Sequence, residues 1–117
     1  MAHVKSRFSG LRYAGQAKGD KRAYHVFESA DSLLVVSAGR SQHSYNANAV
    51  DRRGLDLVGR KFKGRKVTSA HVFKKAGRRD LFPGRFDALN VLYAMVATGR
   101  ALKLKQRDGR SILFKIK

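Results

Sequence analysis

The chain has 117 residues, of which 43% are hydrophobic, and its 26 Lys and Arg outnumber 8 Asp and Glu to give a net charge of +18. This size and composition favour a single folded domain, and the charge favours a polyanionic partner, with nucleic acid ahead of an anionic membrane surface. The absence of cysteine excludes disulfides and cysteine-ligated zinc, and no apolar run approaches the roughly 20 residues of a membrane span. We therefore expect an intracellular protein, cytoplasmic or nucleoid-associated, that binds nucleic acid rather than a membrane.

The acidic residues are too few and too dispersed to indicate catalysis. Metal-dependent nucleases need clustered carboxylates and glycosidases need a matched pair, whereas no two of the acids here share such a motif. The four histidines lie in different segments, at spacings that match no metal template. We therefore expect no enzyme, no cofactor and no metal. A pairing of His25 with His43 as acid and base keeps open one minor alternative, a small nuclease or toxin.

The first 45 residues are expected to carry an arm and a hairpin. Residues 1–22 hold six Lys or Arg and three spaced glycines without periodicity, which is typical of a flexible basic arm. In residues 23–45, β-branched and aromatic residues on both sides of a polar break predict a β-hairpin followed by a polar loop. The continuous apolar run 33–36 predicts that the second strand is buried on both faces. We expect this hairpin to pack on the core or to mediate a homodimer.

Two helices are predicted next, joined by a short extended link. Apolar residues at helical spacing indicate the first over 46–62, although its two interior glycines each cost about 1 kcal/mol relative to Ala. The second covers 68–77, where Thr68 or Ser69 can cap the first amides and Gly77 suits a left-handed stop.

The third predicted helix has the strongest periodicity in the chain. It follows a connection that contains the helix breakers Pro83 and Gly84. Residues 86–96 then carry apolar side chains three and four apart. We expect this helix to end at Gly99, a residue suited to a left-handed stop.

The C-terminal residues alternate apolar and cationic side chains on both sides of an Asp-Gly pair, which predicts a β-hairpin. A two-residue turn would put the two apolar rows on opposite faces of this hairpin. A three-residue loop, 107–109, puts them on one face by pairing residue 104 with 112. We therefore expect the longer loop, with a positive φ at Gly109.

From residue 46 to 117, the order of a helix, an extended link, two more helices and a basic hairpin resembles the winged helix-turn-helix DNA-binding domains. The best local match is formed by Leu92, Met95, Gly99 and Leu102, followed by the hairpin. The resemblance implies an α+β fold in which an N-terminal β-hairpin precedes a three-helix winged helix-turn-helix with a C-terminal two-stranded wing. It also implies that the third helix enters the major groove of DNA.

Cations dominate the segment that the resemblance covers: residues 52–85 hold twelve Lys or Arg against two Asp. On the third helix, Asn90 can pair with adenine and Arg85 with guanine or a phosphate, while the other cations contact the backbone. We expect a small DNA-binding protein, a transcriptional regulator or a DNA-organising protein, with double-stranded DNA as its partner. An RNA-binding or ribosome-associated protein is the alternative. The candidate binding residues are Arg52, Arg53, Lys63, Arg65, Lys66, Lys74, Lys75, Arg78, Arg79, Arg85, Asn90, Lys103, Lys105, Arg107 and Arg110.

Overall fold

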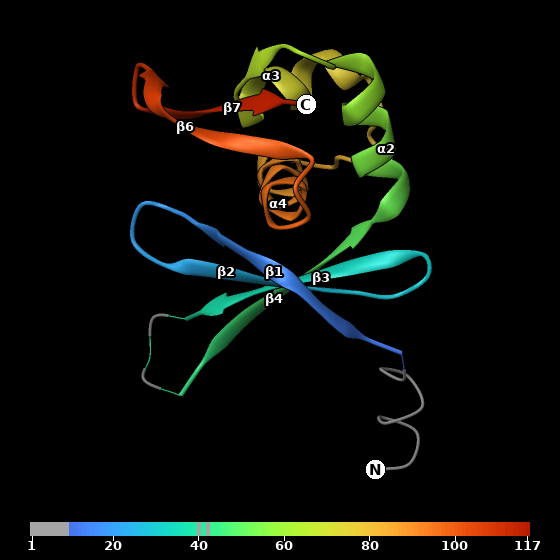
Figure 1. The fold of residues 1–117 in the computed structure, drawn as a ribbon, viewed down its shortest axis with the longest axis vertical. Coiled ribbons are helices and arrows are strands. Elements are labelled where there is room, and N and C mark those ends of the chain that lie inside the picture. Colours follow the sequence, from blue (N-terminus) through green and yellow to red (C-terminus); the bar gives the residue numbers. More distant parts are fainter. Residues whose placement is uncertain (1–9, 40, 42) are drawn as a thin grey trace.

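A computed structural model describes residues 10–39, 41 and 43–117, which form an α+β fold with two antiparallel sheets and three helices (Figure 1). The elements are, in chain order, β1 (Arg12–Lys18), β2 (Ala23–Glu28), β3 (Ser32–Ala38), β4 (Tyr45–Asp51), α2 (Arg52–Lys61), β5 (Lys66–Val67), α3 (Ser69–Ala76), α4 (Arg85–Ala97), β6 (Ala101–Asp108) and β7 (Ser111–Ile116). The first four strands form one sheet in the order β1-β2-β3-β4, and the second sheet has the order β5-β7-β6.

The expected fold, an isolated β-hairpin before a winged helix-turn-helix with a two-stranded wing, is wrong. The hairpin β2–β3 is the centre of a four-stranded sheet, and the C-terminal sheet has three strands. β1 lies inside the segment expected to be a flexible arm, and residues 1–9 of that arm are outside the described part. β4 occupies the start of the helix expected over 46–62, and the observed helix begins only at Arg52. Pairing with β3, Ala47 opposite Val36 for example, prevails here over the local apolar spacing.

The C-terminal hairpin also differs from our expectation, since β5 adds a third strand to the predicted two-stranded wing. Leu102 pairs with Lys115 near the base of the hairpin, and Asp108 pairs with Ser111 at its tip, so the three-residue loop is wrong. The positive φ of Gly109 is confirmed, at 62°. The core sets this register, because the fully buried Phe114 must face α4, which leaves Leu102 48% exposed.

Three helix ends with clear local signals are confirmed. The Thr68 hydroxyl accepts a hydrogen bond from the His71 amide at 3.1 Å, which caps α3. Gly77 closes the same helix with a φ of 67°, and Gly99 follows α4 with a φ of 80°. These signals involve neighbours in the sequence only, so they do not depend on the rest of the fold.

Helix α4 is the centre of the molecule, with the four-stranded sheet on one side and α2, α3 and the second sheet on the other (Figure 1). Its residues from Val91 to Met95 are all buried, so this part of the helix is apolar on every side. Tyr93 stacks on Tyr24 of β2 with ring centroids 4.1 Å apart and meets Phe114 of β7 edge-on at 5.8 Å. One hydrophobic core therefore joins both layers through this helix.

The outer face of the four-stranded sheet, which points away from α4, is nearly free of charge. Its central positions lie opposite one another in the strand pairing, and are Tyr13, Gln16, His25, Phe27, Leu34, Val36, Ala47 and Ala49. The Tyr13 hydroxyl and His25 Nδ1 are hydrogen bonded at 3.0 Å on this face. Burial on β3 alternates, with Leu33 and Val35 in the core and Leu34 half-exposed, so the expected burial of this strand on both faces is wrong.

Candidate nucleic-acid interface

An acid-free run of cations begins in the last turn of α2 and continues through α3. No Asp or Glu occurs between residues 57 and 79. Within the described chain, eight exposed cations of this run make no ion pair, and we call them the basic surface: Arg60, Lys61, Lys63, Arg65, Lys66, Lys74, Lys75 and Arg79. The elements that carry them lie across α4 from the four-stranded sheet (Figure 1).

Local structure explains part of this arrangement. Arg60 and Lys61 lie in the last turn of α2, and Lys74 and Lys75 lie in the last turn of α3. Cations stabilise the negative end of a helix dipole by a few tenths of a kcal/mol each, up to about 1 kcal/mol. That preference accounts for single cations at helix ends. It does not account for eight without a carboxylate partner, which together repel one another unless a polyanion is bound.

Five of the predicted binding residues are instead held by carboxylates. Their pairs are Arg52 with Glu28 at 3.3 Å, Arg53 with Asp51 at 2.7 Å, Arg78 with Asp80 at 2.8 Å, and both Lys103 and Arg107 with Asp20. Arg52 also donates to the Ser29 carbonyl at 2.8 Å, so it joins the β2–β3 turn to the start of α2. The Arg78 guanidinium lowers the pKa of Asp80 to about 2, which keeps that pair charged at neutral pH.

The other predicted cations are exposed and make no ion pair with the described residues. Six of them belong to the basic surface, Arg85 lies at the start of α4, and Lys105 and Arg110 extend from the wing, the hairpin of β6 and β7. The guanidinium of Arg79 lies 4.0 Å from the ring centroid of Phe73. Our sequence-based selection omitted Arg60 and Lys61, although the same acid-free run includes them.

The covered position of α4 removes the role that the family resemblance implied for it. A DNA major groove is about 12 Å wide and admits a single helix, whereas α4 carries a four-stranded sheet along one side. Only its first turn is open to a large partner, with Arg85 and Phe86 exposed there. Insertion of α4 along a major groove is therefore excluded in this structure, and base readout by Arg85 is limited to the helix end.

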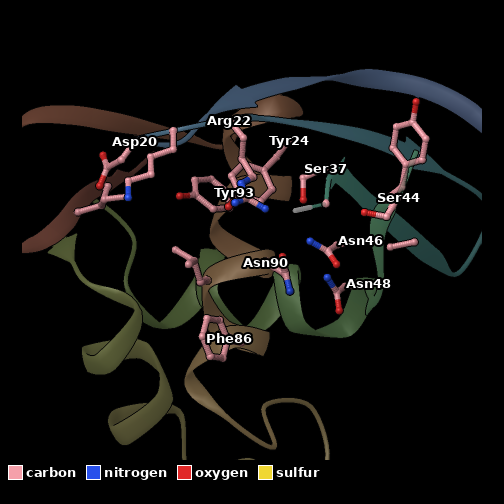
Figure 2. A pocket seen from close by; sticks show the side chains of 16 residues that line it. Asp20, Arg22, Tyr24, Ser37, Ser44, Asn46, Asn48, Phe86, Asn90 and Tyr93 are labelled. Carbon is pink, nitrogen blue, oxygen red and sulfur yellow. The ribbon is translucent and has the colours of Figure 1, made fainter. Parts of the chain in front are cut away.

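Asn90 lies in a groove of about 1070 Å³ between the four-stranded sheet and α4 (Figure 2). Asn46 and Asn48 of β4 line the opposite wall, and Ile112 of the wing closes one part of it. Tyr24 and Tyr93 also line the groove. Burial and, to a smaller extent, the nearby Tyr24 raise the pKa of Tyr93 to about 12, so its hydroxyl stays protonated at neutral pH. This groove could not be predicted from the sequence, because its walls come from distant segments.

No family model, no curated protein and no solved structure matches this chain. Among the residues that the structure describes, no helix combines the length and apolarity needed to cross a membrane. The same residues include no group of three or more His, Cys, Asp or Glu that could hold a metal ion. The basic surface and the groove are therefore the candidate functional sites.

Proposed function

We propose that this protein binds nucleic acid, with duplex DNA as its preferred partner, and that it holds the phosphates through the basic surface and the wing. The observation that carries the proposal is the set of eight exposed, unpaired cations in a run of chain without acids. Each phosphate neutralised by such a cation releases counterions, which gives affinity without sequence preference. With α4 covered, a role in organising DNA is better supported than recognition of a defined site.

The resemblance to winged helix-turn-helix domains gives this proposal further support. From α2 to β7, the described elements keep the order of helices and strands on which the resemblance was based. In such domains the wing contacts the DNA backbone, and here Lys105 and Arg110 are exposed on the wing. The sheet over α4 sets this protein apart from domains that insert their third helix, so we propose a different mode of contact, in which the basic surface and the wing hold phosphates.

The proposal is tested by measuring affinity for a DNA duplex of about 25 base pairs, and for the RNA duplex of the same sequence, across a salt titration. We expect log K to fall against log salt with a slope of about −5 to −7, the value for about six to eight phosphate contacts. We also expect tighter binding to DNA. Equal or tighter binding to RNA would make the RNA-binding or ribosome-associated alternative the leading account, and a shallow slope would contradict both.

We also propose that the protein forms a homodimer through the outer face of the four-stranded sheet, in an intracellular compartment. Two copies of a chain with a net charge of +18 repel each other, and this face is where the strands carry the fewest cations. It also gathers apolar side chains, as association surfaces do. A four-stranded face is small for an interface, so we expect a weak dimer.

Val36→Glu is expected to abolish this dimer, because Val36 is central on the face, opposite His25 and Ala47. Sedimentation equilibrium over a range of protein concentrations measures the association. Ser111→Glu adds the same charge on the exposed end of β7 and is expected to leave the dimer intact. A wild-type protein that stays monomeric at all concentrations would remove the homodimer from the proposal.

A further inference from the structure

The groove between β4 and α4 has polar side chains at positions where the strand pattern calls for core residues. Val50 and Asn48 lie opposite the buried Leu33 and Val35 of β3, and Asn46 lies opposite the buried Ser37. These residues therefore occupy the face of β4 that turns toward α4. Val50 enters the core there, while both asparagines are exposed. The sheet thus continues past the core as the wall of an open groove.

Three carboxamides converge in this groove without protein partners. Asn46 and Asn48 come from β4 and Asn90 comes from the facing side of α4, and all three point into the same space (Figure 2). None of the three side chains forms a hydrogen bond with any residue that the structure describes. Each carboxamide offers one acceptor and two donors, the combination that matches the edge of a nucleobase.

An exposed aromatic ring completes the recognition elements. Phe86, on the first turn of α4, lines the groove and is 82% exposed, which is unusual for so large an apolar side chain. Unpaired bases stack on exposed aromatic rings in proteins that bind single-stranded nucleic acid, whereas a base inside a duplex offers no free face.

Cations beside the groove are placed to contact a nucleic-acid backbone. Lys21 and Arg22, in the β1–β2 turn, lie among its lining residues. The adjacent Asp20 pairs with Lys103 and Arg107 of β6, which places the wing beside this turn. A strand held by the wing would therefore pass the groove. The volume of about 1070 Å³ is at the upper end of the range for ligand pockets and is sufficient for a nucleotide.

We propose that this groove receives an unpaired nucleobase of the bound nucleic acid. The carboxamides of Asn46, Asn48 and Asn90 bind the edge of the base, and Phe86 stacks on its face. Lys21 contacts the adjoining phosphate. The inference rests on the proposed binding of nucleic acid, and it adds a preference for DNA with a bulged or single-stranded base over fully paired DNA.

The test compares a fully paired DNA duplex with the same duplex carrying a short bulge, using fluorescence anisotropy. We expect the wild-type protein to bind the bulged duplex about tenfold more tightly, a difference that the stacking of one base can supply. The double variant Asn48→Ala, Asn90→Ala is expected to lose this preference and to keep the wild-type affinity for the paired duplex. Phe86→Ala is expected to behave in the same way, and circular dichroism checks that both variants fold.

Gln16→Ala is the matched control, because it removes an exposed carboxamide from the opposite face of the sheet. It is expected to keep the preference for the bulge. Equal binding of the wild-type protein to both duplexes would overturn the groove proposal and leave the proposed function standing, whereas no binding to either would overturn both. If a free nucleoside monophosphate competes with the bulged duplex at similar affinity, the groove is a site for free nucleotides. The proposal that it receives a base of a nucleic-acid strand is then wrong.

Discussion

Replacement of both Lys74 and Lys75 by Gln is expected to lower the affinity for duplex DNA about 30-fold at a salt concentration of about 0.15 M. Both side chains are exposed in the last turn of α3, and neither forms an ion pair with a described residue. If each contacts one phosphate, the slope of log K against log salt becomes shallower by about 1.8, and that slope gives the loss in affinity. A salt titration of the variant and the wild type measures both quantities.

The matched control is the double variant Arg12→Gln, Lys18→Gln, which removes the same charge from β1. Both residues are exposed on the four-stranded sheet, across α4 from the basic surface. The Arg12 side chain is 78% exposed in its ion pair with Glu28, and Glu28 keeps its pair with Arg52 when Arg12 is replaced, so the control costs little stability. We expect this control to keep a slope close to that of the wild type. Equal losses in the two variants would mean that net charge alone, and not the basic surface, determines binding.

Gly15→Ala is expected to have the second large effect, a decrease of about 3 to 5 kcal/mol in the free energy of unfolding. Gly15 of β1 has a φ of 140°, which side-chain-bearing residues rarely adopt. A Cβ atom there would lie 2.5 Å from the carbonyl oxygen of Ala97 at the end of α4. The position of a Cβ atom is fixed by the backbone and its neighbour here is a backbone oxygen, so no side-chain rotation relieves the clash, and β1 must move away from the helix.

Gly64→Ala separates the clash from the backbone strain, because Gly64 also has a positive φ, 76°, but an added Cβ there would meet no atom within 4 Å. We expect this control to cost about 1 kcal/mol. Urea denaturation followed by circular dichroism gives both free energies. If the two variants lose the same stability, β1 is not held against α4 as described.

The parts of the fold that were predictable depend on neighbours in the sequence. The cap of α3 at Thr68, its stop at Gly77 and the periodicity of α4 are local signals, and all three were read from the sequence. β4 was missed because Val50 was grouped with Leu55 and Val58 in one apolar stripe, and only its pairing with β3 fixes it as a strand. The register of the last hairpin was missed for a similar reason, since it depends on a core contact across the molecule.

The candidate site was likewise predictable only where its signal lies in neighbouring residues of the sequence. The acid-free run of cations can be read directly from the sequence, and it identified most of the basic surface. Which cations are neutralised was not predictable, because Glu28 is 24 residues from Arg52, and Asp20 is 87 residues from Arg107. The groove was not predictable either. Asn90 was selected because of its position on the third helix, whereas its neighbours in space are Asn46 and Asn48 on another element.

The central position of α4 also has a consequence for how the molecule opens. A protein with two layers around separate cores can lose one layer while the other persists, and its amide protons then exchange with solvent at two levels of protection. Here the residues from Val91 to Met95 are buried by both layers at once, so detaching either layer uncovers the same helix. Hydrogen exchange at these amides therefore reports the unfolding of the entire described chain, and the sheet and the helical half share a single stability.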